Sequence, residues 1–196
     1  MKHLKGNSYD VVKLVIDQLG ISIFALVLYI SMNIVGENNE QLGFVLNILA
    51  SVFSILFYWA LLYSIMWEMG AKDCIRIESG KTEKFAPKGA LLALFANLVN
   101  LLLAGLAVVF EIVRLCFGTD ALNGITTIFF VIIRFTSAMF LRSVNAICLP
   151  FGGDGVYIAE GAVYMLFFIM TIGVCQLAYS LGMNNFKIFG SKAKKQ

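Results

Sequence analysis

Charged residues inside or beside apolar segments are the ones whose chemistry the sequence could use. Glu111 and Arg114 lie three residues apart, a spacing that lets two side chains on one helix form an ion pair. Arg134 and Arg142 follow within a largely apolar stretch, and guanidinium groups near a membrane could bind an anionic group. The residues therefore predict either a structural ion pair beside two separate arginines or an anion-binding cluster.

Small and polar residues recur every three or four positions on three apolar segments, which places them on one face of each expected helix. The lines comprise Gly89, Ala93, Ala96, Asn100, Ala104, Ala107, Glu111 and Arg114 on one segment, Asn47, Ser51, Ser54 and Tyr58 on another, and Glu160, Tyr164, Thr171, Cys175, Ala178 and Gly182 on the last. Such faces either pack helices together or surround a polar cavity in which Asn47 and Asn100 are contacts at mid-membrane depth.

Signatures of metal, nucleophile or phosphate-loop chemistry do not occur. His3 is the single histidine, and the four cysteines lack the C-x-x-C spacing of zinc and thiol-redox sites. The run Gly80, Lys81, Thr82 lacks the first glycine of a phosphate-binding loop. The sequence therefore predicts no cofactor and no metal, and it favours a protein that is not an enzyme.

The composition indicates which elements must position these residues. Of the 196 residues, 60% are apolar or aromatic and 14% are charged, whereas a soluble domain averages about 45–50% apolar and about 25% charged residues. The mean hydropathy is +0.85. We therefore predict one all-α integral membrane domain whose first partner is the lipid bilayer. No basic face with interleaved aromatic residues occurs, which excludes nucleic acid as a partner.

Four apolar runs approach or exceed the roughly 20 residues that a helix needs to cross a bilayer. We expect spans at residues 15–35, 42–67, 89–113 and 159–183, a cytoplasmic loop at 68–88 and a basic cytoplasmic tail at 184–196. Pro87 and Pro150 lie outside the runs, where helices should begin or end. The fold class is therefore a bundle of four transmembrane helices.

Residues 121–149 are harder to place, because Arg134 and Arg142 interrupt their apolar character. A charge at the bilayer centre costs about 2.5–3.5 kcal/mol on insertion scales. We therefore expect an interfacial or re-entrant outer helix whose polar face includes Arg134, Ser137 and Arg142, with a fifth span as the alternative. Four spans leave Arg114, Arg134 and Arg142 outside and the other twelve of the fifteen Lys and Arg inside, as the positive-inside rule requires.

Two further predictions follow from this layout. Cys116 and Cys148 both lie on the outer side, where oxidising conditions would allow a disulfide; unpaired, buried thiols are the alternative. On the inner side, the alternation around Cys74, Ile75 and Arg76 could form a small hairpin. The loop that contains it, residues 68–88, is either an ordinary solvated loop or a docking surface for a cytosolic partner.

Three functional hypotheses are compatible with these features. The first is a transport or membrane-complex subunit that contacts a substrate, a lipid or other membrane subunits through its polar faces. The second is an intramembrane enzyme that acts on a lipid or lipid-linked substrate through Glu111 and the outer arginines, and the third is a structural accessory protein. The chain resembles, in general form only, short polytopic proteins of bacterial membranes with a lysine-rich tail, a likeness that implies no activity and no site residues. From the size of the chain and the absence of a targeting segment we expect the plasma membrane, and from the positive-inside rule we expect both termini in the cytoplasm.

Overall fold

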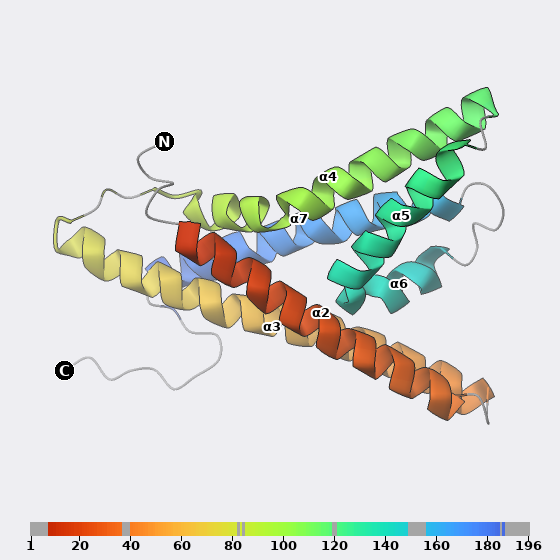
Figure 1. Cartoon of the computed structure of the whole chain (residues 1–196). Coiled ribbons are helices and arrows are strands. Elements are labelled where there is room, and N and C mark those ends of the chain that lie inside the picture. The colour runs from red at the N-terminus through yellow and green to blue at the C-terminus, as the bar shows by residue number, and fades with distance from the viewer. Residues whose placement is uncertain are drawn as a thin grey trace.

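The computed structural model describes residues 8–36, 40–81, 83, 85–118, 121–148, 156–184 and 186. These residues form six α-helices and no strand, which confirms the all-α prediction (Figure 1). The helices are α2 (Ser8–Gly36), α3 (Glu40–Glu78), α4 (Lys88–Phe117), α5 (Ala121–Thr136), α6 (Ala138–Cys148) and α7 (Val156–Met183).

Four of these helices, α2, α3, α4 and α7, are long and apolar enough to cross a membrane. The shortest of them, α7, has 28 residues, or roughly 42 Å at about 1.5 Å per residue, against a hydrocarbon core of roughly 30 Å. Large apolar side chains such as Val27, Leu56, Val99 and Leu177 are exposed along them. Contiguous apolar surface of this kind is typical of a face that contacts lipid.

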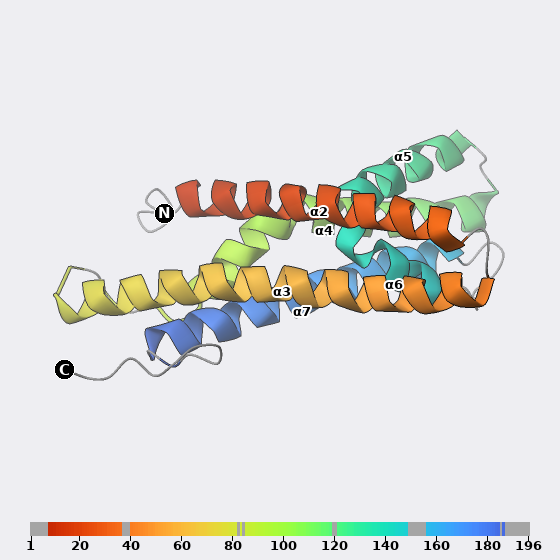
Figure 2. The same cartoon turned by 90° about the horizontal axis from the view of Figure 1, so that it is seen from below.

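The long helices run alongside one another, with α7 packed against both α3 and α4 and with α2 against α3 (Figures 1 and 2). Helices α2 and α4 begin, and α3 and α7 end, at the same end of the bundle (Figure 1). We name it the basic end, because Lys13, Lys72, Arg76 and Lys88 lie near these helix termini. The opposite end is named the hairpin end.

Glycines allow α3 and α7 to approach each other at backbone distance. A Cβ atom on Gly70 would collide with the backbone carbonyl of Tyr179, and one on Gly182 would collide with that of Trp67. In a membrane bundle, where apolar burial between helices contributes little, such close contacts between small residues are a main source of association. The small face predicted for the last span is therefore a packing face at this point.

Helices α5 and α6 form a hairpin that starts and finishes at the hairpin end (Figures 1 and 2). The break between them is at Ser137, whose N–H donates to the carbonyl of Ile133 while its own carbonyl accepts from the N–H of Phe140. The hairpin packs among the long helices, because Ser137, Met139 and Phe140 are no more than 1% exposed. We name Thr136, Ser137 and Ala138 the hairpin tip.

This hairpin corrects two of the predictions for residues 121–149. The prediction of one amphipathic helix lying in the interface is wrong. Ser137 on its polar face and Met139 on its opposite face are both buried. The fifth-span alternative is also not supported, because α5 has 16 residues and α6 has 11, each fewer than the roughly 20 that a span needs. The re-entrant alternative has the observed shape.

The long helices overlap the expected spans, and their ends lie within seven residues of the expected ends except at the basic end of α3. The expected second span, 42–67, continues as one helix to Glu78, so the hairpin expected around Cys74 to Arg76 is wrong. Apolar and polar residues alternate there, but the residues that face the bundle, Met66, Gly70 and Asp73, follow helical spacing. Helix α4 begins directly after Pro87, as expected, and Pro150 lies outside the described residues.

Candidate functional site

Glu111 and Arg114 form the ion pair that their spacing predicts. The Glu111 carboxylate accepts from Arg114 Nη2 at 2.7 Å and from Nε at 3.1 Å. Glu111 is 1% exposed and the side chain of Arg114 is 16% exposed, so the pair is withdrawn from the surface at the hairpin end of α4. Because both charges are compensated locally, this arrangement stabilises the fold and leaves little charge to attract a ligand.

Arg134 pairs with Glu160, a partner that the sequence does not indicate. Its Nε and Nη2 donate to the two carboxylate oxygens of Glu160, each at 2.6 Å, and connect α5 to α7. Glu160 is 2% exposed. Glu160 belongs to the polar line predicted for the last span, but its partner depends on how the hairpin packs. Two parallel hydrogen bonds of this kind fix the relative position of two helices.

Arg142 differs from the other two arginines at this end. Its Nη2 donates to the backbone carbonyl of Tyr29 at 2.6 Å and to Asn33 Oδ1 at 3.5 Å, and its guanidinium lies 4.7 Å from the centroid of the Tyr29 ring. Within the part of the chain that the structure describes, no carboxylate pairs with it, and its Nε is buried without a hydrogen-bond partner. Among the residues that the structure describes, no carboxylate therefore compensates the positive charge of Arg142.

These contacts separate the charges that an enzyme at the hairpin end would have to combine. Glu111 pairs with Arg114, Arg134 pairs with Glu160, and Arg142 contacts the backbone of α2. Catalysis through Glu111 and the outer arginines requires acid and cation groups within hydrogen-bond reach in one cavity. No hydrogen bond joins Glu111 to Arg134 or Arg142 among the described residues.

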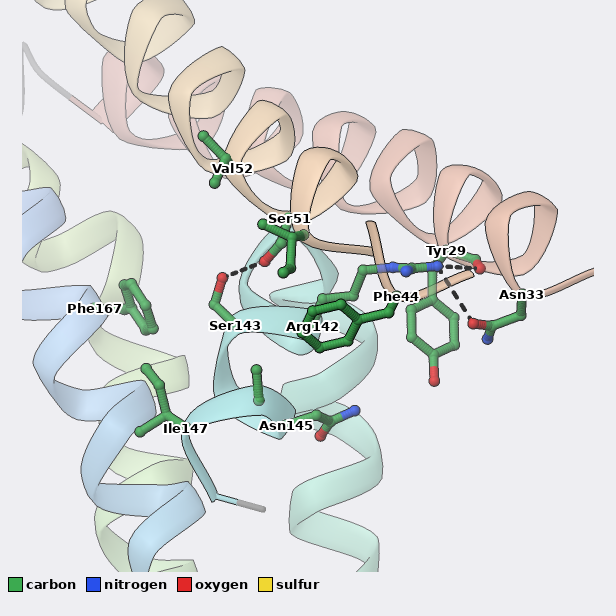
Figure 3. A pocket seen from close by; sticks show the side chains of 12 residues that line it. Tyr29, Asn33, Phe44, Ser51, Val52, Arg142, Ser143, Asn145, Ile147 and Phe167 are labelled. Atoms are coloured by element: carbon green, nitrogen blue, oxygen red, sulfur yellow. Dashed lines mark hydrogen bonds between the residues drawn. The ribbon is translucent and has the colours of Figure 1, made fainter. Parts of the chain in front are cut away.

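A cavity of about 550 Å³ lies beside Arg142, between α2, α3, α6 and α7 (Figure 3). Its wall includes the large apolar side chains of Phe44, Ile48, Val52, Ile147 and Phe167. Phe44, Ile48, Val52 and Ile147 are also exposed on the outside of the bundle, so the cavity opens onto the apolar surface. Its volume is within the roughly 300–1,000 Å³ typical of ligand pockets.

Polar groups occupy only part of this wall. Arg142 and Asn33 lie together where α2 approaches its end, and the hydroxyls of Ser51 and Ser143 form a hydrogen bond between α3 and α6 (Figure 3). A mostly apolar cavity with a few fixed polar groups is typical of sites for small amphipathic molecules. Of the predicted site residues, Arg142 is the one that lines this cavity.

Asn100, predicted as a contact at mid-membrane depth, holds the hairpin tip. Its Oδ1 accepts from Thr136 Oγ1 at 3.0 Å, and the Ser22 hydroxyl of α2 donates to the Thr136 carbonyl. Asn100 is 8% exposed. The polar atoms at the tip are therefore used to anchor the hairpin between α2 and α4. The side chain of Asn47 lies outside the described residues.

The three polar lines are mostly buried in contacts between helices. The line on α4 from Gly89 to Glu111 and the line on α7 from Glu160 to Gly182 are buried throughout. On α3, Ser54 and Tyr58 are buried and Ser51 is half-buried. These observations favour the packing interpretation for the lines themselves, whereas the cavity lies beside the α3 line.

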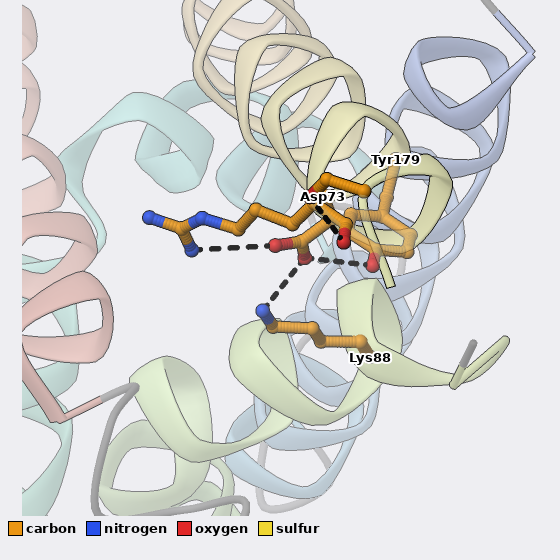
Figure 4. A network of polar contacts seen from close by, with 5 residues as sticks. Asp73, Lys88 and Tyr179 are labelled. Carbon is orange, nitrogen blue, oxygen red and sulfur yellow. Dashed lines mark hydrogen bonds and ion pairs between the residues drawn. The ribbon is translucent and has the colours of Figure 1, made fainter. Parts of the chain in front are cut away.

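A polar network ties three long helices together at the basic end (Figure 4). Asp73 on α3 accepts from Lys88 Nζ at 2.6 Å and from the Tyr179 hydroxyl at 2.9 Å, and lies 3.6 Å from Arg76 Nη1. Asp73 is 7% exposed. Sequence reasoning missed this residue by assigning it to a loop. The available signal was helical spacing, since Tyr58, Leu62, Met66, Gly70 and Asp73 follow one another at steps of four or three.

Gln176 on α7 adds a cap to the start of α4. Its Oε1 accepts from the N–H of Ala90 at 2.8 Å, and its Nε2 donates to the carbonyl of Ala86 at 2.9 Å. The first N–H groups of a helix have no partner within it, so this side chain satisfies a group that would otherwise be unpaired. The network and the cap are structural rather than chemical sites.

All four cysteines are free thiols, so the possible disulfide between Cys116 and Cys148 is not formed. Cys116 is exposed, whereas Cys148 is buried on α6. Among the residues with described positions, no three His, Cys, Asp or Glu side chains cluster in a way that could hold a metal ion.

The fold and site together define an all-helical bundle with four helices of membrane-spanning length, a helical hairpin inserted at one end and an apolar cavity beside it. The chain matches no protein-family model, and the searches find no significant similarity to a curated protein or to a solved structure.

Proposed function

We propose that the chain is a multi-pass membrane protein that binds an amphipathic molecule of the bilayer, as a subunit of a transport system or of another membrane complex. The cavity beside Arg142 carries this proposal. It has the volume of a ligand site, it opens onto surface that lipid would cover, and most of its wall is apolar. A water-soluble solute would gain little from such a wall, whereas an amphipathic molecule would bury its apolar part there.

The arrangement of charges supports an orientation in which the basic end faces the cytoplasm. Lys13, Lys72, Arg76 and Lys88 lie at the basic end, and Arg114, Arg134 and Arg142 belong to the other half of the bundle. The positive-inside rule would place the basic end, and with it both termini, in the cytoplasm of a plasma membrane. The hairpin would then be re-entrant from the outside. Its non-helical break is compatible with that depth because it is buried in protein.

A fluorescent, uncharged diacylglycerol analogue tests the proposal on the purified full chain in detergent micelles. We expect saturable binding that Ala146→Trp weakens about tenfold or more, because Ala146 lines the cavity and an indole would occupy it. Ala60→Trp is the matched control, since Ala60 is exposed on α3 away from the cavity lining. Non-saturable binding, or equal binding by both variants, would contradict the proposal.

A further inference from the structure

Among the described residues at the hairpin end, one guanidinium has no counter-ion. Arg114 and Arg134 each donate two hydrogen bonds to a buried carboxylate, whereas Arg142 has no carboxylate among the residues described and lines the cavity. A charge at a membrane interface is normally paired or hydrated, because leaving it uncompensated in a poorly polar site is costly. An anionic group within the cavity would compensate it.

The guanidinium of Arg142 is already positioned to receive such a group. Nη2 is held by the Tyr29 carbonyl at 2.6 Å and the group lies over the Tyr29 ring (Figure 3). No described residue accepts a hydrogen bond from Nη1 or Nε. Because Arg presents its five N–H groups in a rigid fork, fixing one edge leaves the remaining donors oriented for an oxyanion.

The polar and apolar parts of the cavity meet at its mouth, and the apolar wall extends further along the bundle axis. Asn33 is three residues from the end of α2, and Phe44 is four residues from the start of α3. Val52 is eight residues further along α3 than Phe44, or roughly 12 Å deeper at about 1.5 Å per residue. The guanidinium lies at this mouth, since it donates to Tyr29 and Asn33, and the apolar wall continues from beside it toward the middle of the bundle.

We propose that the cavity binds an anionic phospholipid from the leaflet at the hairpin end. Its phosphate accepts hydrogen bonds from Arg142, and one acyl chain lies along Ile48, Val52 and Phe167. This inference rests on the proposed function and specifies its ligand class. A phospholipid is favoured over a soluble anion because the site opens onto surface that lipid would cover, and over a fatty acid because phospholipids are the bulk component there.

Competition between lipids tests the ligand class. Purified full-length chain is equilibrated in mixed micelles that contain equal amounts of phosphatidylglycerol and phosphatidylcholine, and native mass spectrometry counts the lipid retained on each protein. We expect about a tenfold preference for phosphatidylglycerol, because the choline cation of phosphatidylcholine offsets the phosphate charge that would otherwise compensate Arg142. Arg142→Gln should abolish this preference, and Arg142→Lys should keep part of it.

Arg76→Gln is the matched control, because Arg76 is an arginine at the basic end whose side chain is 61% exposed, and it should keep the full preference. If Arg142→Gln does not fold, Arg142→Lys and Ala146→Trp test the proposal in its place. Arg142→Lys keeps the charge, and Ala146→Trp fills the cavity. If both lipids are retained equally and Ala146→Trp reduces their retention, the proposal of an anionic ligand is overturned. The proposed function is then still supported.

Retention that Ala146→Trp does not change overturns the proposed function itself. In a third arm, oleate replaces phosphatidylglycerol at the same charge ratio. Stronger retention of oleate than of phosphatidylglycerol, dependent on Arg142, overturns the choice of a phospholipid. A preference for phosphatidylglycerol that survives in Arg142→Gln overturns the role of the guanidinium.

Discussion

At the residue scale, the two members of an ion pair at the hairpin end should differ in how much stability is lost when one of them is replaced. Arg134 and Glu160 form an ion pair in which the two side chains differ in exposure. The Glu160 side chain is 2% exposed and that of Arg134 is 39% exposed. Removing one partner of a buried pair is costly chiefly because the remaining charge stays buried. The consequence should therefore depend on which of the two residues is changed.

We predict that Arg134→Gln destabilises the protein more than Glu160→Gln. The first leaves a buried carboxylate without its cation, a loss of about 3–5 kcal/mol, whereas the second leaves a guanidinium that can still reach the surface. The apparent Tm of each purified variant in the same detergent measures the difference. Replacing both residues together should restore part of the loss, because no buried charge remains.

The exposed pair of Glu68 and Lys72 is the control for this prediction. Its side chains are 60% and 62% exposed, and an exposed pair contributes less than about 1 kcal/mol, so Lys72→Gln should leave the apparent Tm nearly unchanged. A larger loss for Glu160→Gln than for Arg134→Gln would show that the burial of Glu160 does not control the energetics.

The sequence indicated which charged residues matter at this end but not how they pair. Glu111 and Arg114 could be paired from sequence because a spacing of three is a local property of one helix. Arg134 and Glu160 are 26 residues apart on different helices, so their contact depends on tertiary packing. Asp73 was missed for a related reason, because its burial depends on α3 continuing to Glu78.

At the element scale, close contact between α3 and α7 depends on the absence of a side chain. The Cβ position of Gly182 is blocked by the backbone of Trp67, which cannot move as a flexible side chain could. Gly173, on the same helix, has no atom within 4 Å of its Cβ position. The two glycines therefore provide a matched pair in which only the contact with α3 differs.

We predict that Gly182→Ala lowers the free energy of unfolding by about 1–3 kcal/mol, the range for overpacking, because α3 and α7 must separate. Gly173→Ala should be neutral or stabilise by up to about 1 kcal/mol, since alanine favours the helix. Apparent Tm values of the two variants in one detergent test this. A Tm for Gly182→Ala equal to or above that of Gly173→Ala would mean that the helices do not touch there.

The polar lines illustrate how far elements could be predicted from sequence. The faces of α4 and α7 were predicted correctly because burial follows the helical period. The break at Ser137 was not predicted, because neither proline nor glycine marks it. It depends on the tip hydrogen bonds to Ser22 and Asn100, which lie on two other helices. The cavity likewise requires four helices to be in place.

At the scale of the whole molecule, the hairpin bears on which helix ends share a side of the bundle. Helix α4 separates Lys81 from Cys116, and α5, α6 and α7 separate Cys116 from Asn184. If α5 and α6 enter and leave on one side, Cys116 alone of these three positions faces the outside. A fifth span would instead bring Asn184 to the side of Cys116. All three residues are exposed, so a thiol reagent could reach each of them.

We predict that a maleimide unable to cross membranes labels Cys116 in intact cells when the other three cysteines are replaced by serine. In a variant without native cysteines, Lys81→Cys and Asn184→Cys should react only after the membrane is opened, because the basic end is held inside by its Lys and Arg. Labelling of Asn184→Cys in intact cells would indicate an even number of crossings between Cys116 and Asn184, so that α5 and α6 together cross once before α7. The hairpin would then not be re-entrant. If Lys81→Cys were labelled in intact cells and Cys116 were protected, the bundle would have the opposite orientation. The basic end would lie outside, and the cavity with Arg142 would lie in the cytoplasmic leaflet.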